Sequence, residues 1–144
     1  MQHEIVSRQA WIEARTALLA KEKEFTRRRD ELNAERRALP WVKVDKAYVF
    51  DGPNGKVTLS DLFAGRSQLF IKHFMLGPGQ VGQCVGCSFE VDHLAGIRVH
   101  LENHGLTYAV VARSPLVQIV AVRKRMGWYF TWVSSVCSDF NYDF

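Results

Sequence analysis

Cys84 and Cys87, two cysteines separated by two residues, are the side chains with the clearest capacity for chemistry. A third cysteine, Cys137, makes the count odd, which argues against a framework of structural disulfides. The first residues lack the basic and apolar segments of a signal peptide, so we expect a cytoplasmic protein. In a reducing compartment a Cys-x-x-Cys pair is usually redox-active or metal-binding.

The position of the pair favours redox chemistry. It follows an apolar, strand-like run at residues 69–76, and a helical pattern begins near Cys87. Free N–H groups and the helix dipole stabilise a thiolate at a helix N-terminus. We therefore predict that Cys84 is the exposed nucleophile and that Cys87 resolves the mixed disulfide. The alternative to redox chemistry is that the two cysteines are inert thiols in a buried turn and have only a structural role.

Metal binding is the chemical alternative, because thiolates also bind zinc. A structural zinc site takes four ligands. Cys137 and a histidine would have to complete it, and the candidates are His73, His93, His100 and His104. Only His100 and His104 have the spacing of a ligand pair, and they lie a helix length from Cys84 in the predicted fold. We therefore expect no metal and no cofactor.

Hydrophobic periodicity indicates the elements that position the cysteines. From residue 69 the chain is typical of a strand, a helix, a strand, a helix and a strand, at residues 69–76, 87–103, 106–112, 114–127 and 128–133. Right-handed crossovers make such strands parallel, with helices covering the sheet. The first apolar run predicts a central strand covered on both faces. The cysteines follow its carboxyl end, where ligands bind in α/β sheets.

Shorter elements precede and follow this alternation. Residues 41–50 predict an extended segment, residues 51–55 a turn and residues 56–59 a second strand, followed by a capped helical turn that starts at Ser60. Ser114 and Pro115 predict a cap and first turn for the second long helix. The C-terminal residues 139–144 alternate polar and aromatic side chains, which predicts an extended segment.

The N-terminal part predicts one long amphipathic helix over residues 6–38. Ser7 could cap its start and Pro40 marks its end. Its apolar stripe recurs every seven residues: Trp11, Leu18, Phe25, Leu32 and Leu39. Such a stripe is buried against its own domain or against a second subunit. We expect an N-terminal helix at residues 1–40 and a domain at residues 41–144.

The composition limits the partners of the chain. The sequence is 47% hydrophobic, which is enough for one domain with a core. It contains no run of about 18 apolar residues, so no membrane span is predicted. The net charge of +4 comes largely from basic clusters at residues 27–29 and 123–125. Both clusters fall in helical patterns with apolar faces, so we interpret them as solvated. We expect no nucleic-acid and no membrane partner.

Six stretches carry a resemblance to a known family: residues 57–63, 73–78, 84–89, 124–128, 132–135 and 138–144. On these the whole chain resembles the DUF899 group of bacterial thioredoxin-like proteins. The resemblance implies an α/β fold, a thioredoxin-like three-layer sandwich, preceded here by the long N-terminal helix. It departs from thioredoxin itself at Gln83, which replaces tryptophan, and at Val85 and Gly86, which replace glycine and proline.

The chain ends at Phe144, before the cis-proline segment, hairpin and final helix of a thioredoxin fold, so we expect the C-terminal hairpin and helix to be lacking. An open sheet edge and a long amphipathic helix together predict a homodimer. The expected function is a thioredoxin-like thiol–disulfide oxidoreductase that acts through Cys84 and Cys87 on a protein or small-molecule disulfide. The alternative from another class is a catalytically weak binding or assembly module on the same fold.

Overall fold

The computed structural model describes residues 3–144, which form two compact units that divide between Val44 and Asp45. The first unit contains α1 (Arg8–Ala38), a helix of 31 residues and therefore about 46 Å long. The Ser7 hydroxyl caps it by accepting the N–H of Ala10 at 3.2 Å. The helix ends before Pro40, which has no N–H to continue the hydrogen-bond ladder. The long N-terminal helix is thus confirmed.

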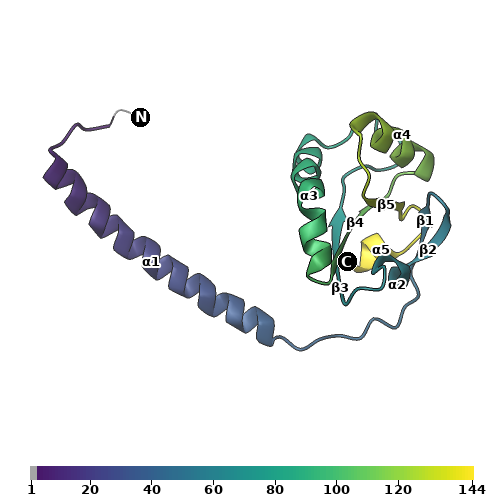
Figure 1. Ribbon diagram of the computed structural model, residues 1–144, viewed down its shortest axis with the longest axis horizontal. Coiled ribbons are helices and arrows are strands. Elements are labelled where there is room, and N and C mark those ends of the chain that lie inside the picture. Colours follow the sequence, from purple (N-terminus) through teal and green to yellow (C-terminus); the bar gives the residue numbers. More distant parts are fainter. Residues whose placement is uncertain (1–2) are drawn as a thin grey trace. The chain divides into compact units, whose positions relative to one another are not determined.

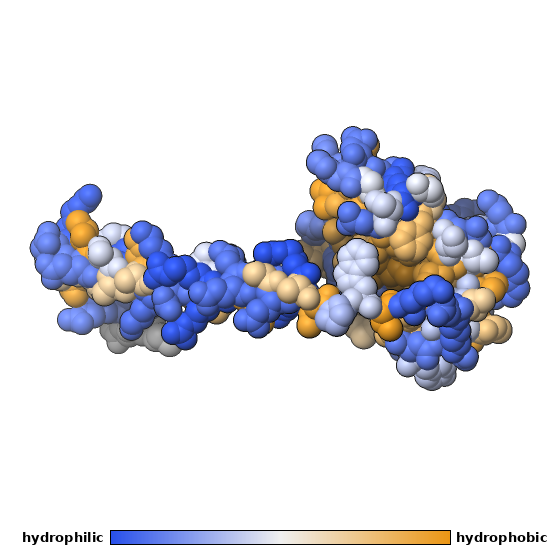
Figure 2. All heavy atoms as spheres, turned by 90° about the horizontal axis from the view of Figure 1, so that it is seen from below, coloured by the Kyte–Doolittle hydropathy of each residue, from blue (hydrophilic) through white to orange (hydrophobic). Residues whose placement is uncertain are grey.

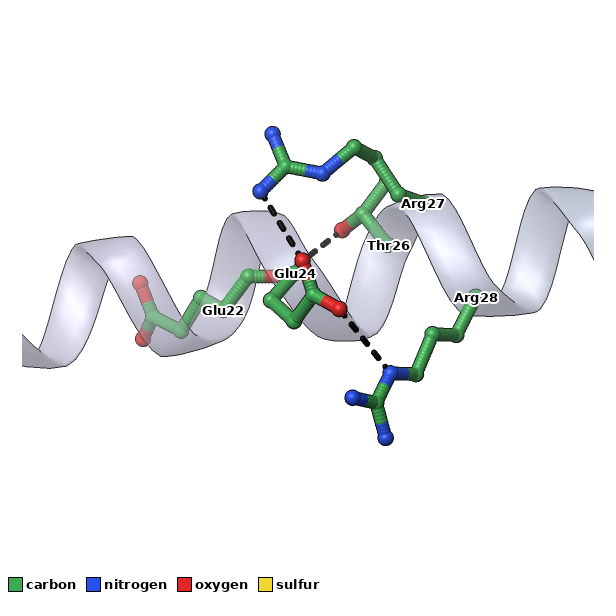
Figure 3. A network of polar contacts seen from close by, with 5 residues as sticks. All are labelled: Glu22, Glu24, Thr26, Arg27 and Arg28. Atoms are coloured by element: carbon green, nitrogen blue, oxygen red, sulfur yellow. Dashed lines mark hydrogen bonds and ion pairs between the residues drawn. The ribbon is translucent and has the colours of Figure 1, made fainter.

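Polar contacts between residues three or four apart stabilise α1 along its surface. Glu24 accepts hydrogen bonds from Arg27 at 3.0 Å and Arg28 at 2.9 Å, and the Thr26 hydroxyl donates to the carbonyl of Glu22 (Figure 3). Exposed pairs of this kind contribute a few tenths of a kcal/mol each. No residue of α1 is buried, so the helix has no core of its own.

The second unit is built on a five-stranded mixed sheet with the order β2-β1-β5-β4-β3 (Figure 1). Its strands are β1 (Val49–Gly52), β2 (Gly55–Thr58), β3 (Gln68–His73), β4 (Leu106–Ala112) and β5 (Thr131–Ser134). β1 pairs antiparallel with β2 and β5, whereas β3, β4 and β5 are parallel. The predicted parallel strands with helical crossovers are therefore confirmed.

Helices cover both faces of this sheet. They are α2 (Leu59–Leu62), α3 (Val85–Asn103), α4 (Leu116–Met126) and α5 (Phe140–Asp143). Alternate side chains of β4 point to opposite faces: Tyr108 and Val110 pack with residues of α3 and α4, whereas Ala109 and Val111 pack with residues of α2 and α5. The unit therefore has three layers, and none of the helices in residues 3–144 is long and apolar enough to cross a membrane.

The prediction of a central strand at residues 69–76 was wrong. β3 lies at the end of the sheet and pairs only with β4 among the described residues, and its Phe70 side chain is 44% exposed. The central, fully covered strand is β4, in which every residue after Leu106 is buried. An apolar run indicates that at least one face of a strand is buried, but it does not indicate how many strands pair with it.

Local predictions were confirmed in part. The two strands joined by a turn are β1 and β2, but β1 begins only at Val49, so residues 41–47 of the predicted extended segment belong to no strand. The capped helical turn is α2, and its cap is Thr58, whose hydroxyl accepts the N–H of Asp61 while the Asp61 carboxylate accepts the N–H of Thr58. Ser114 does not cap α4; its hydroxyl donates to the Gln118 side chain instead.

The C-terminal segment forms the helix α5 and not the extended segment that its alternation predicted. Phe140 is buried against Tyr48 and Phe50, with ring centroids 5.4 and 5.1 Å apart. The Asp143 carboxylate accepts hydrogen bonds from Lys46 at 2.7 Å and Tyr48 at 2.6 Å. Aromatic packing and two polar contacts thus override the local pattern and fix α5 against the sheet.

Candidate functional site

Cys84 is the N-cap residue of α3. Its Sγ accepts the backbone N–H of Cys87 at 3.2 Å. This hydrogen bond is the main cause that lowers the pKa of Cys84 below its ordinary value, with smaller contributions from the Gly86 N–H and the Lys72 charge. Because the first N–H groups of a helix have no partner within it, a thiolate at the N-cap is stabilised there. The helix start therefore provides a reactive position for this sulfur.

Cys87 lies one turn further along α3 in a different environment. It is 4% exposed, and burial raises the pKa of its thiol, while the backbone N–H of Met75 partly opposes that rise. Both cysteines are free thiols, and Cys84 is only partly buried. The structure thus brings together one accessible thiol that ionises readily and one buried thiol that retains its proton.

A chain of hydrogen bonds holds the Cys84 turn in place. Arg125 of α4 donates to the Gln83 side chain, which donates at 2.8 Å to the hydroxyl of Ser88. That hydroxyl in turn donates to the Cys84 carbonyl at 2.8 Å. Gln83, noted in the sequence only as a departure from thioredoxin, therefore connects the cysteine turn to α4.

Lys72 is a residue near the dithiol that the sequence interpretation missed. It lies on β3, forms an ion pair with Glu90 of α3, and its positive charge lowers the pKa of both Cys84 and Cys87 as a lesser cause. A signal was present, because Lys72 interrupts an otherwise apolar run. Placing it beside the cysteines required knowing how α3 packs on β3.

The remaining sequence candidates do not join this site. Cys137 is an exposed free thiol in the segment that follows β5. His100 and the C-cap residue His104 lie at the C-terminal end of α3, about 24 and 30 Å along the helix from Cys84. Within residues 3–144 no group of three or more His, Cys, Asp or Glu side chains is placed to hold a metal ion. The metal-binding hypothesis therefore gains no ligand set from the described residues.

A hollow near the cysteine turn brings in further residues that the sequence interpretation missed. A pocket of about 270 Å³ is lined by residues at the carboxyl ends of β3 and β4 and by Asn141 of α5. Arg113, directly after β4, contributes the charged group. The rule that ligands bind beyond the carboxyl ends of parallel strands could have identified Arg113. Asn141 was hidden because its segment was expected to be extended.

Comparison with known proteins places the chain in a family. No curated protein matches the sequence. The model of a family described as bacterial proteins of unknown function, DUF899, matches residues 1–144, which is the whole chain. The match includes both the N-terminal helix and the α/β unit that carries Cys84 and Cys87. The resemblance seen in the sequence is thereby confirmed, and the chain belongs to the DUF899 family.

Proposed function

We propose that this protein is a thiol–disulfide oxidoreductase on a thioredoxin-like three-layer fold, with Cys84 as nucleophile and Cys87 as resolving thiol. The observation that carries the proposal is the position of the Cys84 sulfur at the start of α3, where it accepts the N–H of Cys87. A free dithiol that cycles needs a supply of reductant, so the proposed location is the cytoplasm.

The proposed reaction moves two electrons from the dithiol to a substrate disulfide. The Cys84 thiolate attacks one substrate sulfur, the substrate S–S bond breaks, and the other substrate sulfur leaves as a thiolate. Cys87 then loses its proton and attacks the Cys84 sulfur, which releases the second substrate thiol and forms the Cys84–Cys87 disulfide. A cellular dithiol reductant restores the pair by the reverse exchange.

The unequal pKa values of the two thiols fit this order of events. Cys84 ionises first, because a backbone N–H stabilises its thiolate. Cys87 keeps its proton, since it is buried and the Cys84 thiolate repels a second negative charge. Formation of the mixed disulfide removes that charge, and deprotonation of Cys87 then becomes easier. The pair therefore favours attack by Cys84 and resolution by Cys87.

The architecture supports the thioredoxin-like part of the proposal. Parallel strands with helices on both faces, and a dithiol after the strand β3, agree with such a fold. The described residues contain no cis peptide bond, so they hold no cis-proline opposite Cys84. The outer edge of β3, unpaired within residues 3–144, is where a further strand would join.

The proposal includes a homodimer formed through α1. A single helix cannot bury its own apolar stripe, and Trp11, Leu18, Phe25 and Leu32 are each between 45% and 68% exposed. Figure 2 shows hydrophobic residues at intervals along this helix, among hydrophilic ones. Because the companion positions Lys21, Arg28 and Glu35 are charged, the stripe is narrower than the seam of a coiled coil. A second copy of the same helix would carry the matching narrow stripe.

A redox titration with thiol labelling tests the proposed chemistry. We expect Cys84 and Cys87 to cycle reversibly between dithiol and disulfide at biological potentials. Cys84→Ser should abolish reduction of a substrate disulfide, whereas Cys87→Ser should trap the mixed disulfide on Cys84. Cys137→Ser serves as the control and should behave as the wild type. If the pair does not cycle in a correctly folded protein, the proposed oxidoreductase function is refuted and the alternative of a binding module is favoured.

A further inference from the structure

The pocket beyond the carboxyl ends of β3 and β4 has one polar side and one apolar side. Its volume is about 270 Å³. Phe74, Met75 and Leu76 supply apolar wall, and the polar groups come from His73, Gln80, Arg113 and Asn141. Small-molecule sites are typically apolar hollows with a few polar groups that fix orientation. The composition of this pocket is of that kind.

Arg113 is held in place without a negative partner. Its guanidinium donates to the Tyr142 hydroxyl at 3.0 Å and lies 5.1 Å from the centre of the Tyr142 ring. Neither contact neutralises its charge, and no carboxylate in residues 3–144 pairs with it. Two acidic residues follow β5, Asp139 and Asp143, and both form ion pairs with Lys46. Arg113 therefore offers a positioned cation with N–H groups to spare.

Asn141 and His73 complete the polar side. The Asn141 side-chain oxygen accepts the Ser135 hydroxyl at 2.6 Å, which leaves its amide N–H groups as the donors available to a ligand. The His73 ring stacks on Phe140 with centroids 5.4 Å apart. Burial, and secondarily the Lys72 charge, lower the pKa of His73, so its imidazole is neutral near pH 7. One cation and additional N–H donors match a carboxylate group.

The pocket adjoins the packed cluster that contains the dithiol. Phe74 and Leu76 line the pocket and belong to the same buried cluster as Cys87, and Cys84 packs against that cluster. Gln80, which also lines the pocket, belongs to the loop that leads to Cys84, and this loop is anchored where Gln118 of α4 donates to the Gln80 carbonyl at 2.8 Å. A molecule bound in the pocket therefore lies beside the segment that contacts the redox pair.

We propose that this pocket binds the carboxylate of a small-molecule disulfide, with Arg113 and Asn141 as its specificity-determining residues. The inference rests on the proposed oxidoreductase function and names its substrate class: an acidic low-molecular-weight disulfide. Arg113 gives bidentate recognition of a carboxylate, which a lysine cannot reproduce. The apolar wall formed by Phe74, Met75 and Leu76 receives the carbon chain between the acid and the sulfur.

The test compares two disulfides that differ only in charge, 3,3′-dithiodipropionate and its dimethyl ester. The rate at which each oxidises the reduced protein is divided by the rate at which it oxidises free dithiothreitol. We expect a normalised preference for the acid of about tenfold or more, as hydrogen bonds to a charged group imply. Arg113→Gln should remove that preference by lowering the normalised rate of the acid, and Arg113→Lys should restore only part of it.

Lys124→Gln is the matched control, because it removes the same charge from an exposed position on α4. It should retain the preference of the wild type for the acid. Equal normalised rates for acid and ester in the wild type would overturn the inference. So would equal losses in Arg113→Gln and Lys124→Gln, since they would reflect net charge alone.

A binding measurement separates failure of the pocket from failure of the oxidoreductase. The Cys84→Ser, Cys87→Ser variant cannot react, and we expect 3,3′-dithiodipropionate to shift the NMR signals of the Asn141 side-chain amide and the His73 ring. Adding Arg113→Gln should abolish these shifts. If no disulfide oxidises the wild type but the shifts occur, only the redox function fails. Absent shifts, or shifts that persist without Arg113, would overturn the pocket assignment.

Discussion

At the residue scale, Cys84 and Cys87 have identical side chains three positions apart on one helix, yet their surroundings shift their pKa values in opposite directions. The Cys84 sulfur accepts a hydrogen bond from a backbone N–H, whereas the Cys87 side chain is buried in the core of the unit. The Cys-x-x-Cys spacing and the strand before it were sufficient to predict this pair. The contacts that tune it were not, because Lys72 and Arg125 reach it from β3 and α4, distant in sequence.

The pH dependence of alkylation should distinguish the two thiols. In a Cys87→Ser, Cys137→Ser variant, the rate of reaction of Cys84 with iodoacetamide should rise with pH through a midpoint below about 8.5, the ordinary thiol value. The reason is that the thiolate is the reactive form and the Cys87 N–H stabilises it.

Two comparisons control this measurement. The same variant unfolded in guanidinium chloride should return to a midpoint of about 8.5. In a Cys84→Ser, Cys137→Ser variant, Cys87 should react slowly and with a midpoint above that value, since burial raises its pKa. Coincident midpoints for Cys84 in the folded and unfolded protein would contradict the assignment of Cys84 as the activated nucleophile.

At the element scale, periodicity predicted which helices and strands exist better than it predicted their neighbours. The ends of α3 and α4 were evident from Gly105 and Gly127, which adopt positive φ angles of 74° and 68° just past each helix. The place of β3 at the sheet edge depends on which strands pair. The helix α5 depends on Phe140 packing against β1. Neither relation leaves a trace in local sequence.

The apolar stripe of α1 leads to a prediction about assembly. Phe25→Asp should convert a dimer into a monomer at micromolar concentration, because it places a charge in the middle of the stripe where two helices would meet. Thr16→Asp is the control, since it adds the same charge on the opposite face of the helix and should leave the dimer intact. Light scattering measures both. A monomeric wild type would show that the stripe has no such partner.

At the scale of the whole α/β unit, one face of the sheet buries a polar group that has no hydrogen-bond partner among the described residues. The face under α3 and α4 is rich in aromatic side chains, among them Tyr108, Phe130 and Trp132. Tyr108 is 1% exposed and its hydroxyl has no hydrogen-bond partner in the described residues. Burial raises the pKa of this phenol to about 12. The hydroxyl is therefore a cost to stability that the fold tolerates.

Replacing Tyr108 should reveal that cost. We expect Tyr108→Phe to raise the free energy of unfolding by about 1 kcal/mol, because it removes a buried polar group that lacks a partner. Tyr48→Phe is the matched control and should lower it by about 1 kcal/mol, since it leaves the Asp143 carboxylate without the 2.6 Å hydrogen bond from Tyr48. Urea denaturation followed by tryptophan fluorescence measures both. A loss of stability in Tyr108→Phe would contradict the interpretation.

The hydrogen bond from the Cys87 N–H to the Cys84 sulfur also has an electrochemical consequence. It is strongest when Cys84 is a thiolate, and a disulfide sulfur is a poorer acceptor, so oxidation of the pair weakens it. An interaction that favours the reduced state raises the reduction potential, by about 30 mV for each tenfold change in the equilibrium. If the pair cycles as proposed, this contact would therefore also bias it towards the dithiol, so that its disulfide would be passed on more readily to other thiols.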